Sequence, residues 1–157
     1  MNIKSKEEDL KISFEDFKKQ VLLDYKTAVT SRECSILGRR EVFSGKGKFG
    51  IFGDGKELPQ VAMAKVFEKG DFRSGYYRDQ TFMFSIDELT VQQFFAGLYA
   101  NTNFDEEPMS GGRQMGSHFS SVFIDENGKF KDLPNQYNIS SDISPTSGQM
   151  PRLLGLA

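Results

Sequence analysis

The stretch SIDELTVQQFFAGLYA, residues 85–100, carries the strongest folding signal in this chain. Ser85 is followed three positions later by Glu88, which is the capping-box pattern that begins a helix. Apolar residues then recur at helical spacing, which gives the helix one face to bury: Ile86, Leu89, Phe94, Phe95 and Leu98. We therefore predict an amphipathic helix from Ser85 to about Ala100.

A longer amphipathic helix is expected near the N-terminus. Ser13 and Asp16 resemble a capping box, although Asp is a weaker partner there than Glu or Gln. An apolar stripe follows, which we expect to continue to Ile36 and to need a covering surface: Phe14, Phe17, Val21, Tyr25 and Ala28. Residues 1–12 before this helix are predicted to be a charged arm.

Shorter elements are predicted between these two helices. Five glycines at residues 44–56, with Asp54-Gly55 as a turn signal, predict a glycine-rich loop or hairpin. A helix is expected from about Leu58 to Glu68, because Pro59 suits a first helical turn and Gly70 suits the position past the end. Paired aromatics interrupted by glycine predict a short strand within residues 71–77.

The last third of the sequence is less regular. Residues 101–143 keep no period, apart from a hairpin expected around Val122-Phe123-Ile124 with Asn127-Gly128 at its turn. Residues 150–157 form an apolar, helix-like run that ends without a charge or a cap. Because natural chain ends are usually polar and exposed, we expect a fragment of a longer chain.

Composition excludes several classes of protein. The chain has 157 residues, with 20 Lys and Arg against 22 Asp and Glu, and is 38% apolar, as expected of one soluble domain. It has neither a basic cluster nor an apolar run of membrane-spanning length, so we expect it to bind neither nucleic acid nor a membrane. Its polar N-terminus lacks the apolar core of a secretory signal, which predicts a cytoplasmic location.

Three possible sites have plainer explanations. Gly45-Lys46-Gly47-Lys48-Phe49-Gly50 has the spacing of a dinucleotide-binding turn, but a helix precedes it where a strand is needed, which favours an ordinary loop. Cys34 has no His or Lys nearby in sequence to lower its pKa, which favours an inert thiol. His118 is a candidate base or ligand, although a lone His among Ser and Gly is more often structural.

Tyr76-Tyr77-Arg78-Asp79 is a more specific candidate. An arginine at the exit of a strand offers a planar fork of donors to a phosphate, and an adjacent tyrosine hydroxyl adds another. A surface salt bridge between Arg78 and Asp79 explains the same residues equally well. In the same way, the loop at residues 111–118 could close over a ligand or simply turn a corner.

Four strings, in this order, resemble the thiamine-diphosphate-dependent 2-oxoacid dehydrogenases. They are Tyr77-Arg78-Asp79, the helix of residues 88–99, Gly112-Arg113-Gln114-Met115-Gly116-Ser117-His118, and Ile143-Ser144-Pro145-Thr146-Ser147-Gly148-Gln149-Met150-Pro151. The resemblance covers residues 13–157 and is to the N-terminal part of the alpha-type region of the first, decarboxylating component, closest to the branched-chain (2-oxoisovalerate) branch. It implies an α/β thiamine-diphosphate-binding fold, truncated to a mostly helical N-terminal segment with a few short strands.

The resemblance also implies a function. Such enzymes carry out the oxidative decarboxylation of a 2-oxo acid, branched-chain, pyruvate-like or related, with acyl transfer to lipoyl. The implied partners are a beta-type subunit or region and a lipoyl-bearing acyltransferase, within a homo- or hetero-oligomer, and the fragment alone is expected to be inactive. The alternative is a small helical binding or assembly module without a cofactor.

Individual residues receive roles from the resemblance alone. It implies that Tyr77 and Arg78 contact the diphosphate of the cofactor, with Tyr76 beside them. It further implies that Ser144 and Thr146 line the cofactor, while His118 lies on a loop near the mouth of the active site. No residue of this chain receives a catalytic or metal-binding role.

The chain departs from the family pattern in places that matter. The magnesium motif, Gly-Asp-Gly followed by Asn, is expected after the last helix and is missing, so magnesium and thiamine diphosphate are expected together only in the intact enzyme. Gly53-Asp54-Gly55 has the same letters but precedes Tyr77, and we interpret it as a hairpin turn. Gln80 stands where pyruvate-type relatives carry His, and Gly148 replaces a Thr that helps hold potassium in the branched-chain branch.

Overall fold

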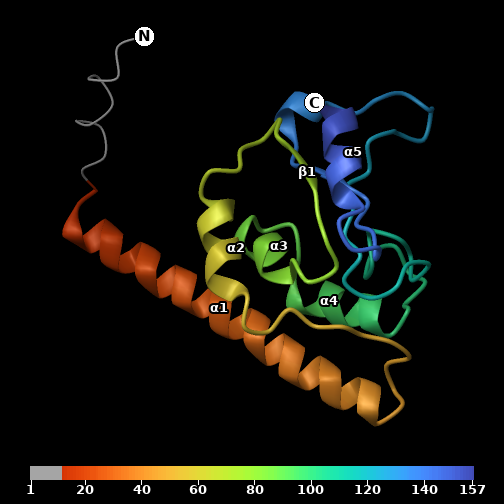
Figure 1. Cartoon of the computed structure of the whole chain (residues 1–157), viewed down its shortest axis with the longest axis horizontal. Coiled ribbons are helices and arrows are strands. Elements are labelled where there is room, and N and C mark those ends of the chain that lie inside the picture. The colour runs from red at the N-terminus through yellow and green to blue at the C-terminus, as the bar shows by residue number, and fades with distance from the viewer. Residues whose placement is uncertain (1–11) are drawn as a thin grey trace.

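The computed structural model describes residues 12–157, which form a mostly helical structure with a small parallel sheet (Figure 1). Of the charged arm predicted for residues 1–12, residues 1–11 lie outside the described part of the chain. The elements in chain order are α1 (Phe14–Phe43), α2 (Glu57–Ala64), β1 (Phe72–Ser74), α3 (Gln80–Ser85), α4 (Val91–Leu98), the 3₁₀ turn η2 (Leu133–Asn135), β2 (Asn138–Ser140) and α5 (Gln149–Leu156). The prediction of a mostly helical segment with a few short strands is confirmed.

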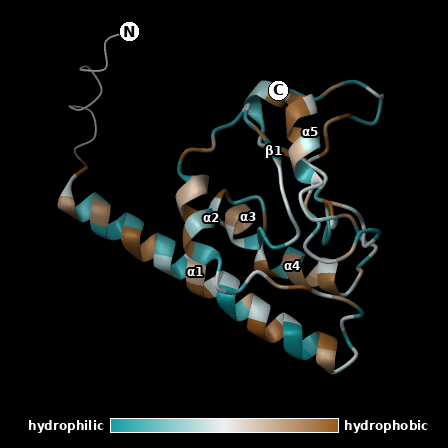
Figure 2. Ribbon diagram, in the orientation of Figure 1, coloured by the Kyte–Doolittle hydropathy of each residue, from teal (hydrophilic) through white to brown (hydrophobic). Residues whose placement is uncertain are grey.

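Helix α1 begins where the sequence predicts and continues past Ile36 to Phe43. The Ser13 hydroxyl accepts the Asp16 backbone N–H, which satisfies a donor that the first turn leaves free. The N-terminal half of α1 projects away from the other helices (Figure 1), and Figure 2 shows hydrophobic residues alternating with hydrophilic ones along it.

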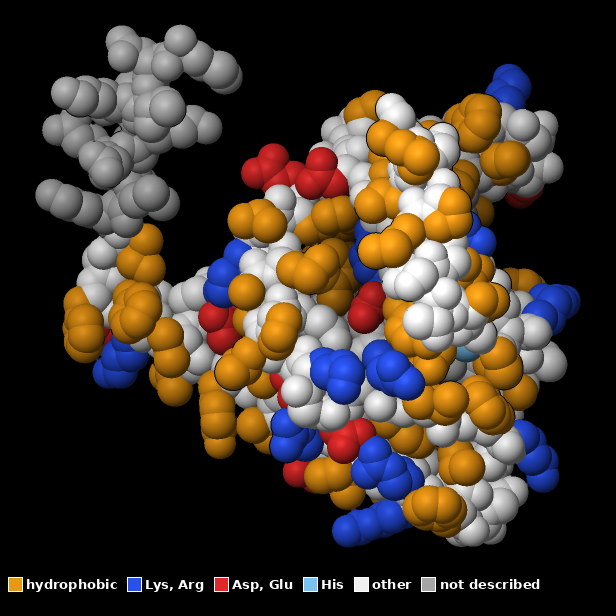
Figure 3. Space-filling model, in the orientation of Figure 1, with side chains coloured by type: hydrophobic (Ala, Val, Ile, Leu, Met, Phe, Trp, Pro, Cys, Tyr) orange, Lys and Arg blue, Asp and Glu red, His pale blue; other side chains and the backbone are white. Residues whose placement is uncertain are grey.

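The apolar stripe of α1 is not covered by the described residues. Phe14, Phe17, Val21 and Tyr25 are all exposed, Phe14 to 74%. Apolar side chains gather on this half of α1 in Figure 3. The helix instead packs through small residues, which allow close approach to α2, α3 and α4: Ser31, Cys34, Ser35 and Gly38.

The prediction of one continuous helix over residues 85–100 is wrong at the N-terminal end of that range. Helix α3 ends at Ser85, and α4 begins only at Val91. Between them Asp87 has a φ of 58°, a left-handed conformation that a right-handed helix cannot include. A capping box does form, but it lies five residues later, between Thr90 and Gln93, so the box predicted for Ser85 and Glu88 is corrected.

The hydrophobic core forms where α3 and α4 meet α1 and β2. Apolar residues that the sequence predicted for one helix face are buried here, even though the turn between α3 and α4 supplies some of them. The buried cluster comprises Cys34, Phe82, Met83, Ile86, Leu89, Phe94, Phe119 and Ile139. Cys34 is among them, and burial raises the pKa of its thiol to about 11, as expected of an inert cysteine.

The strands β1 and β2 pair in parallel, with Arg73 opposite Ile139 and Ser74 opposite Ser140. Parallel strands end at the same edge of a sheet, so the chain after Ser74 and the chain after Ser140 leave it side by side. The loop before β2 reaches this edge as well, because the Asp142 N–H donates to the Phe119 carbonyl over 2.9 Å. Three segments that are distant in sequence therefore meet at the carboxyl ends of the two strands.

The remaining elements follow the sequence with small corrections. Helix α2 ends at Ala64, earlier than the predicted Glu68, and residues 44–56 form a loop without strands. The hairpin at Asn127-Gly128 is reduced to one antiparallel bridge between Ile124 and Phe130. The C-terminal apolar run forms α5, and none of the helices within residues 12–157 has the length and apolar character needed to cross a membrane.

Candidate functional site

The residues singled out from the sequence come together at the carboxyl ends of β1 and β2. Tyr76, Tyr77 and Arg78 follow β1, Ser144 and Thr146 follow β2, and His118 lies on the loop that pairs with the end of β2. His118 connects the residues after β1 with those after β2. Its Nε2 is 2.7 Å from Ser144 Oγ, and its ring stacks on Tyr77 with centroids 5.8 Å apart. Parallel α/β proteins characteristically bind ligands at this edge of a sheet.

Arg78 lies against two tyrosine rings. Its guanidinium carbon is 5.4 Å from the ring centre of Tyr76 and 4.9 Å from that of Tyr77. Arg78 Nη2 donates to the Tyr77 hydroxyl over 2.9 Å, and the two phenol oxygens are 3.0 Å apart. The guanidinium and the phenols thus present several hydrogen-bond donors within a small space.

The acidity of the two phenols differs because they share a hydrogen bond. That bond lowers the pKa of Tyr76, with a further contribution from the Thr146 hydroxyl, and it raises the pKa of Tyr77. The positive charge of Arg78 favours the ionised form of both rings. The Arg78 guanidinium thus places a positive charge beside both hydroxyls.

The surface salt bridge considered between Arg78 and Asp79 does not form. Asp79 Oδ2 accepts instead from Arg73 Nη2 over 2.6 Å and from the Tyr76 N–H over 2.9 Å. No carboxylate within residues 12–157 pairs with Arg78. This half-buried guanidinium is free to pair with an external anion.

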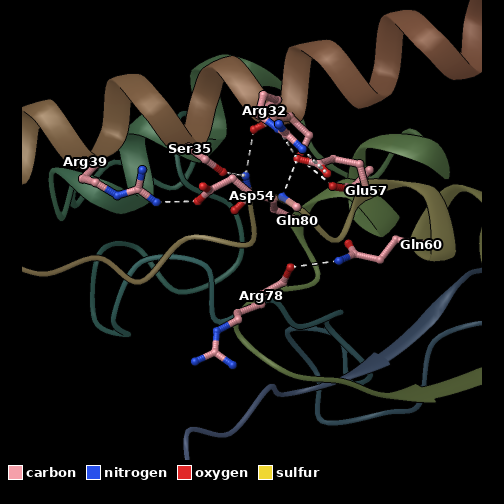
Figure 4. Close-up of polar contacts among 11 residues, drawn as sticks. Arg32, Ser35, Arg39, Asp54, Glu57, Gln60, Arg78 and Gln80 are labelled. Atoms are coloured by element: carbon pink, nitrogen blue, oxygen red, sulfur yellow. Dashed lines mark hydrogen bonds and ion pairs between the residues drawn. The ribbon is translucent and has the colours of Figure 1, made fainter.

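The backbone of Arg78 is fixed from the side of α2, a contact that sequence reasoning missed. Gln60 Nε2 donates to the Arg78 carbonyl over 3.1 Å, while Gln60 Oε1 accepts the Phe82 N–H over 3.0 Å. A Cβ at Gly53 would overlap the same carbonyl, so only glycine fits there. Figure 4 shows the Arg78 side chain pointing away from Gln60 and α1.

Two residues discussed for the family pattern have structural contacts in this fold. Gly53-Asp54-Gly55 lies in a turn of the loop after α1, without the strands of the predicted hairpin, and Asp54 pairs with Arg39 of α1 (Figure 4). Gln80 is fully buried and donates to the Ser31 carbonyl and to Ser35 Oγ over 3.0 and 2.8 Å. Gln80 therefore faces α1 rather than the edge of the sheet.

A bidentate ion pair between Arg32 and Glu57 links α1 to α2 near the backbone of the candidate site. Arg32 donates to both carboxylate oxygens of Glu57 over 2.7 and 2.9 Å (Figure 4). The hydrogen bond from Arg32 lowers the pKa of Glu57 to about 2, although burial opposes the shift. The pair joins α1 to the first residue of α2, from which Gln60 reaches Arg78.

The loop before His118 turns a corner around the buried carboxylate of Glu107. The backbone N–H groups of Met109, Ser110 and Gly112 all donate to this carboxylate, as does the Ser110 hydroxyl. Burial would raise the pKa of Glu107, but these hydrogen bonds outweigh it and leave the pKa below its usual range. At the end of the loop, His118 Nδ1 faces the Gly116 carbonyl at 3.3 Å.

Comparison with known proteins adds no relative: no protein-family model matches the sequence, and a search of curated proteins finds no significant match. Within residues 12–157 there is also no group of three or more His, Cys, Asp or Glu side chains that could hold a metal ion. The site itself presents one cation without a carboxylate partner among residues 12–157, two phenols, one imidazole and two hydroxyls.

Proposed function

We propose that this site binds the diphosphate of thiamine diphosphate, and that the chain is the N-terminal segment of the alpha-type region of a 2-oxoacid dehydrogenase. The observation that carries the proposal is the unpaired Arg78 guanidinium, seated on Tyr76 and Tyr77 at the carboxyl ends of two parallel strands. A half-buried cation without a counter-ion favours an anionic ligand, and the planar fork of arginine matches phosphate oxygens.

The donor set around Arg78 fits a diphosphate in chemistry and in number. A diphosphate carries several oxygens that need charge-assisted donors, which Arg78 and the phenols of Tyr76 and Tyr77 supply. The exposed Thr146 adds a hydroxyl that hydrogen-bonds to Tyr76. The family resemblance places the magnesium motif beyond the last helix, so the present proposal concerns the diphosphate alone.

His118 and Ser144 hold the segments of the site together. His118 and Ser144 share a hydrogen bond at Nε2, which anchors the loop to the segment after β2 and keeps the imidazole ring stacked on Tyr77. Thiamine diphosphate, when bound, supplies the nucleophile and the electron sink for decarboxylation. The protein contributes binding and position at this edge, and a beta-type region and a lipoyl-bearing acyltransferase complete the proposed reaction in the cytoplasm.

The proposal is tested by measuring cofactor affinity in the intact protein. We expect Arg78→Ala to weaken thiamine diphosphate binding by about ten- to a hundredfold, because a charge-assisted contact contributes about 1.5–3 kcal/mol. Arg78→Lys should restore part of this affinity, because it keeps the charge and loses the planar fork. Isothermal titration with magnesium present gives the dissociation constants.

A matched control is Arg39→Ala. Arg39 also has its guanidinium over an aromatic ring, 6.0 Å from the centre of Phe52, but it belongs to α1 and pairs with Asp54. We expect its removal to leave cofactor binding unchanged. Equal dissociation constants for the wild-type protein and Arg78→Ala would refute the assignment of Arg78.

The exposed stripe of α1 favours a second candidate function, a helical binding or assembly module without a cofactor. Phe14, Phe17, Val21 and Tyr25 offer an apolar surface of the kind that binds another protein. The same titration separates the two functions, because such a module binds neither thiamine diphosphate nor inorganic pyrophosphate.

A further inference from the structure

Arg73 is a buried cation beside the site that the proposed function does not use. It lies in β1, is 8% exposed, and has the Phe82 ring centre 5.1 Å from its guanidinium carbon. Its Nη2 donates to Asp79 over 2.6 Å and its Nη1 to Asp142 over 3.2 Å. A Cβ at position 75 would overlap the guanidinium, so Gly75 allows the side chain to pass beneath the turn. We call Arg73, Asp79 and Asp142 the Arg73 node.

The Arg73 node touches all three segments that form the site. Asp79 Oδ2 also accepts the Tyr76 N–H over 2.9 Å, at the start of the turn that carries Arg78. Asp142 Oδ2 accepts the Phe119 N–H over 3.4 Å, one residue after His118, and Asp142 lies two residues before Ser144. One guanidinium thus links the turn after β1, the loop before β2 and the segment after β2.

Stability alone is a weak reason for such a buried cluster. Removing charges from water is costly, and a well-packed apolar cluster of similar volume is often at least as stable. Burial raises the pKa of Asp142 to about 6, so the desolvation of this carboxylate outweighs the attraction of Arg73. Fold stability alone therefore does not account for the Arg73 node.

The choice of partner for Asp79 suggests that role. Asp79 directly follows Arg78, and its carboxylate would neutralise that guanidinium if it turned toward it. Instead Asp79 Oδ2 accepts hydrogen bonds from both Arg73 Nη2 and the backbone N–H of Tyr76. Arg78 is left with only a phenol and two aromatic faces as partners.

We propose that Arg73 is a positioning residue, which holds the Asp79 carboxylate away from Arg78 and so keeps the Arg78 guanidinium available to a diphosphate. The inference rests on the proposed function of the site and extends it to a residue that does not touch the ligand. Without Arg73, Asp79 becomes an internal competitor for the ligand, because it is an anion next to the ligand-binding cation.

The test compares three variants of the intact protein by titration with inorganic pyrophosphate. Arg73→Met removes the cation and keeps an unbranched side chain, and we expect it to weaken binding by about tenfold or more. Asp79→Asn keeps an oxygen for the Tyr76 N–H and removes the competing charge, so binding should stay within about threefold of wild type. The double variant Arg73→Met/Asp79→Asn should recover most of the affinity lost in Arg73→Met.

Recovery in the double variant is the decisive outcome. A purely structural role for Arg73 gives no recovery, because Asp79→Asn restores none of the contacts that Arg73→Met removes, and this result would overturn the proposal. Wild-type affinity in Arg73→Met would overturn it as well. If Arg73→Met does not fold, Arg73→Gln with and without Asp79→Asn gives the same comparison, because Gln also removes the cation.

A crystal structure of Arg73→Met tests the inference without any ligand. The proposal predicts that the Asp79 carboxylate turns to pair with the Arg78 guanidinium. An Asp79 side chain that stays away from Arg78 would refute the inference, whatever the affinities are. If the wild-type protein binds neither pyrophosphate nor thiamine diphosphate, the proposed function fails, and this structure still decides how Asp79 behaves.

Discussion

The Gln60 side chain fixes the backbone of Arg78, the candidate ligand-binding residue, on the side opposite its guanidinium. It is 7% exposed, and its amide satisfies one backbone carbonyl and one backbone N–H, those of Arg78 and Phe82. Arg78 is therefore held at its backbone while its guanidinium remains free. Gly53 completes this arrangement by allowing the loop after α1 to approach the same carbonyl.

Replacing Gln60 should lower the stability of the fold, because the Arg78 carbonyl and the Phe82 N–H lose their hydrogen-bond partner. We expect Gln60→Met to reduce the free energy of unfolding by about 1–3 kcal/mol, because a buried group without a partner carries its full desolvation penalty. Urea unfolding followed by circular dichroism measures the change. The control is Gln20→Met, which removes an exposed hydrogen bond to Asp24 of 2.8 Å and should change stability by less than about 0.5 kcal/mol. Equal losses in the two variants would contradict this account.

At the scale of elements, the break between α3 and α4 is the main local feature of the core. Ile86 and Leu89 lie in the turn between α3 and α4, and their side chains are buried in the core. The chain therefore keeps the apolar contacts predicted for a continuous helix while it changes direction. Asp87 takes the left-handed conformation, and Thr90 with Gln93 then begins a new helix. The apolar pattern is preserved, but the helix start that it implies is displaced.

The position of the capping box predicts which of two hydroxyls stabilises α4. Thr90→Ala should reduce the free energy of unfolding by about 0.5–2 kcal/mol, because Thr90 Oγ1 accepts the Gln93 N–H over 3.1 Å at the N-terminus of α4. Ser85→Ala should cost less than about 0.5 kcal/mol, since the Ser85 hydroxyl only bonds back to the Thr81 carbonyl within α3. Thermal and urea unfolding of both variants give the comparison. A larger loss of unfolding free energy in Ser85→Ala than in Thr90→Ala would contradict this account and favour the cap predicted at Ser85.

At the scale of the whole molecule, apolar surface is exposed at both ends of the described chain. The N-terminal half of α1 exposes Phe14, Phe17 and Tyr25, and α5 exposes Met150 and Leu154, the last to 80%. Exposed patches of this kind mark surfaces that pair with other proteins or with copies of the same chain.

We expect the chain of residues 1–157 to self-associate through the stripe of α1. The double variant Phe17→Glu/Val21→Lys places an i,i+4 ion pair on the exposed face, which keeps the helix while removing its apolar contacts. It should shift the protein toward monomer in sedimentation velocity and reduce the binding of a hydrophobic dye. Lys18→Ala, on the same helix, serves as the control and should leave association unchanged. A wild-type chain that sediments as a monomer at high concentration would contradict the prediction.

Several features of this protein are determined locally and could be predicted from the sequence. The start of α1 follows from Ser13, whose side chain caps the helix within three residues, and the turn at Gly128 follows from the positive φ of 76° that glycine accepts. The choice of Tyr76, Tyr77 and Arg78 as candidate anion donors also needs only their chemistry and their place after a strand. That these donors bind thiamine diphosphate remains a proposal.

The tertiary structure decided what depends on distant partners. The sequence left open whether Asp79 pairs with Arg78, and the answer came from Arg73, which also reaches Asp142 across 69 residues. The contact between His118 and Ser144 likewise depends on how the ends of β1, β2 and the intervening loop pair. Parallel strand pairing and the burial of charges join residues far apart in the chain, and their free energies depend on the whole packed interior, so no local pattern of residues specifies them.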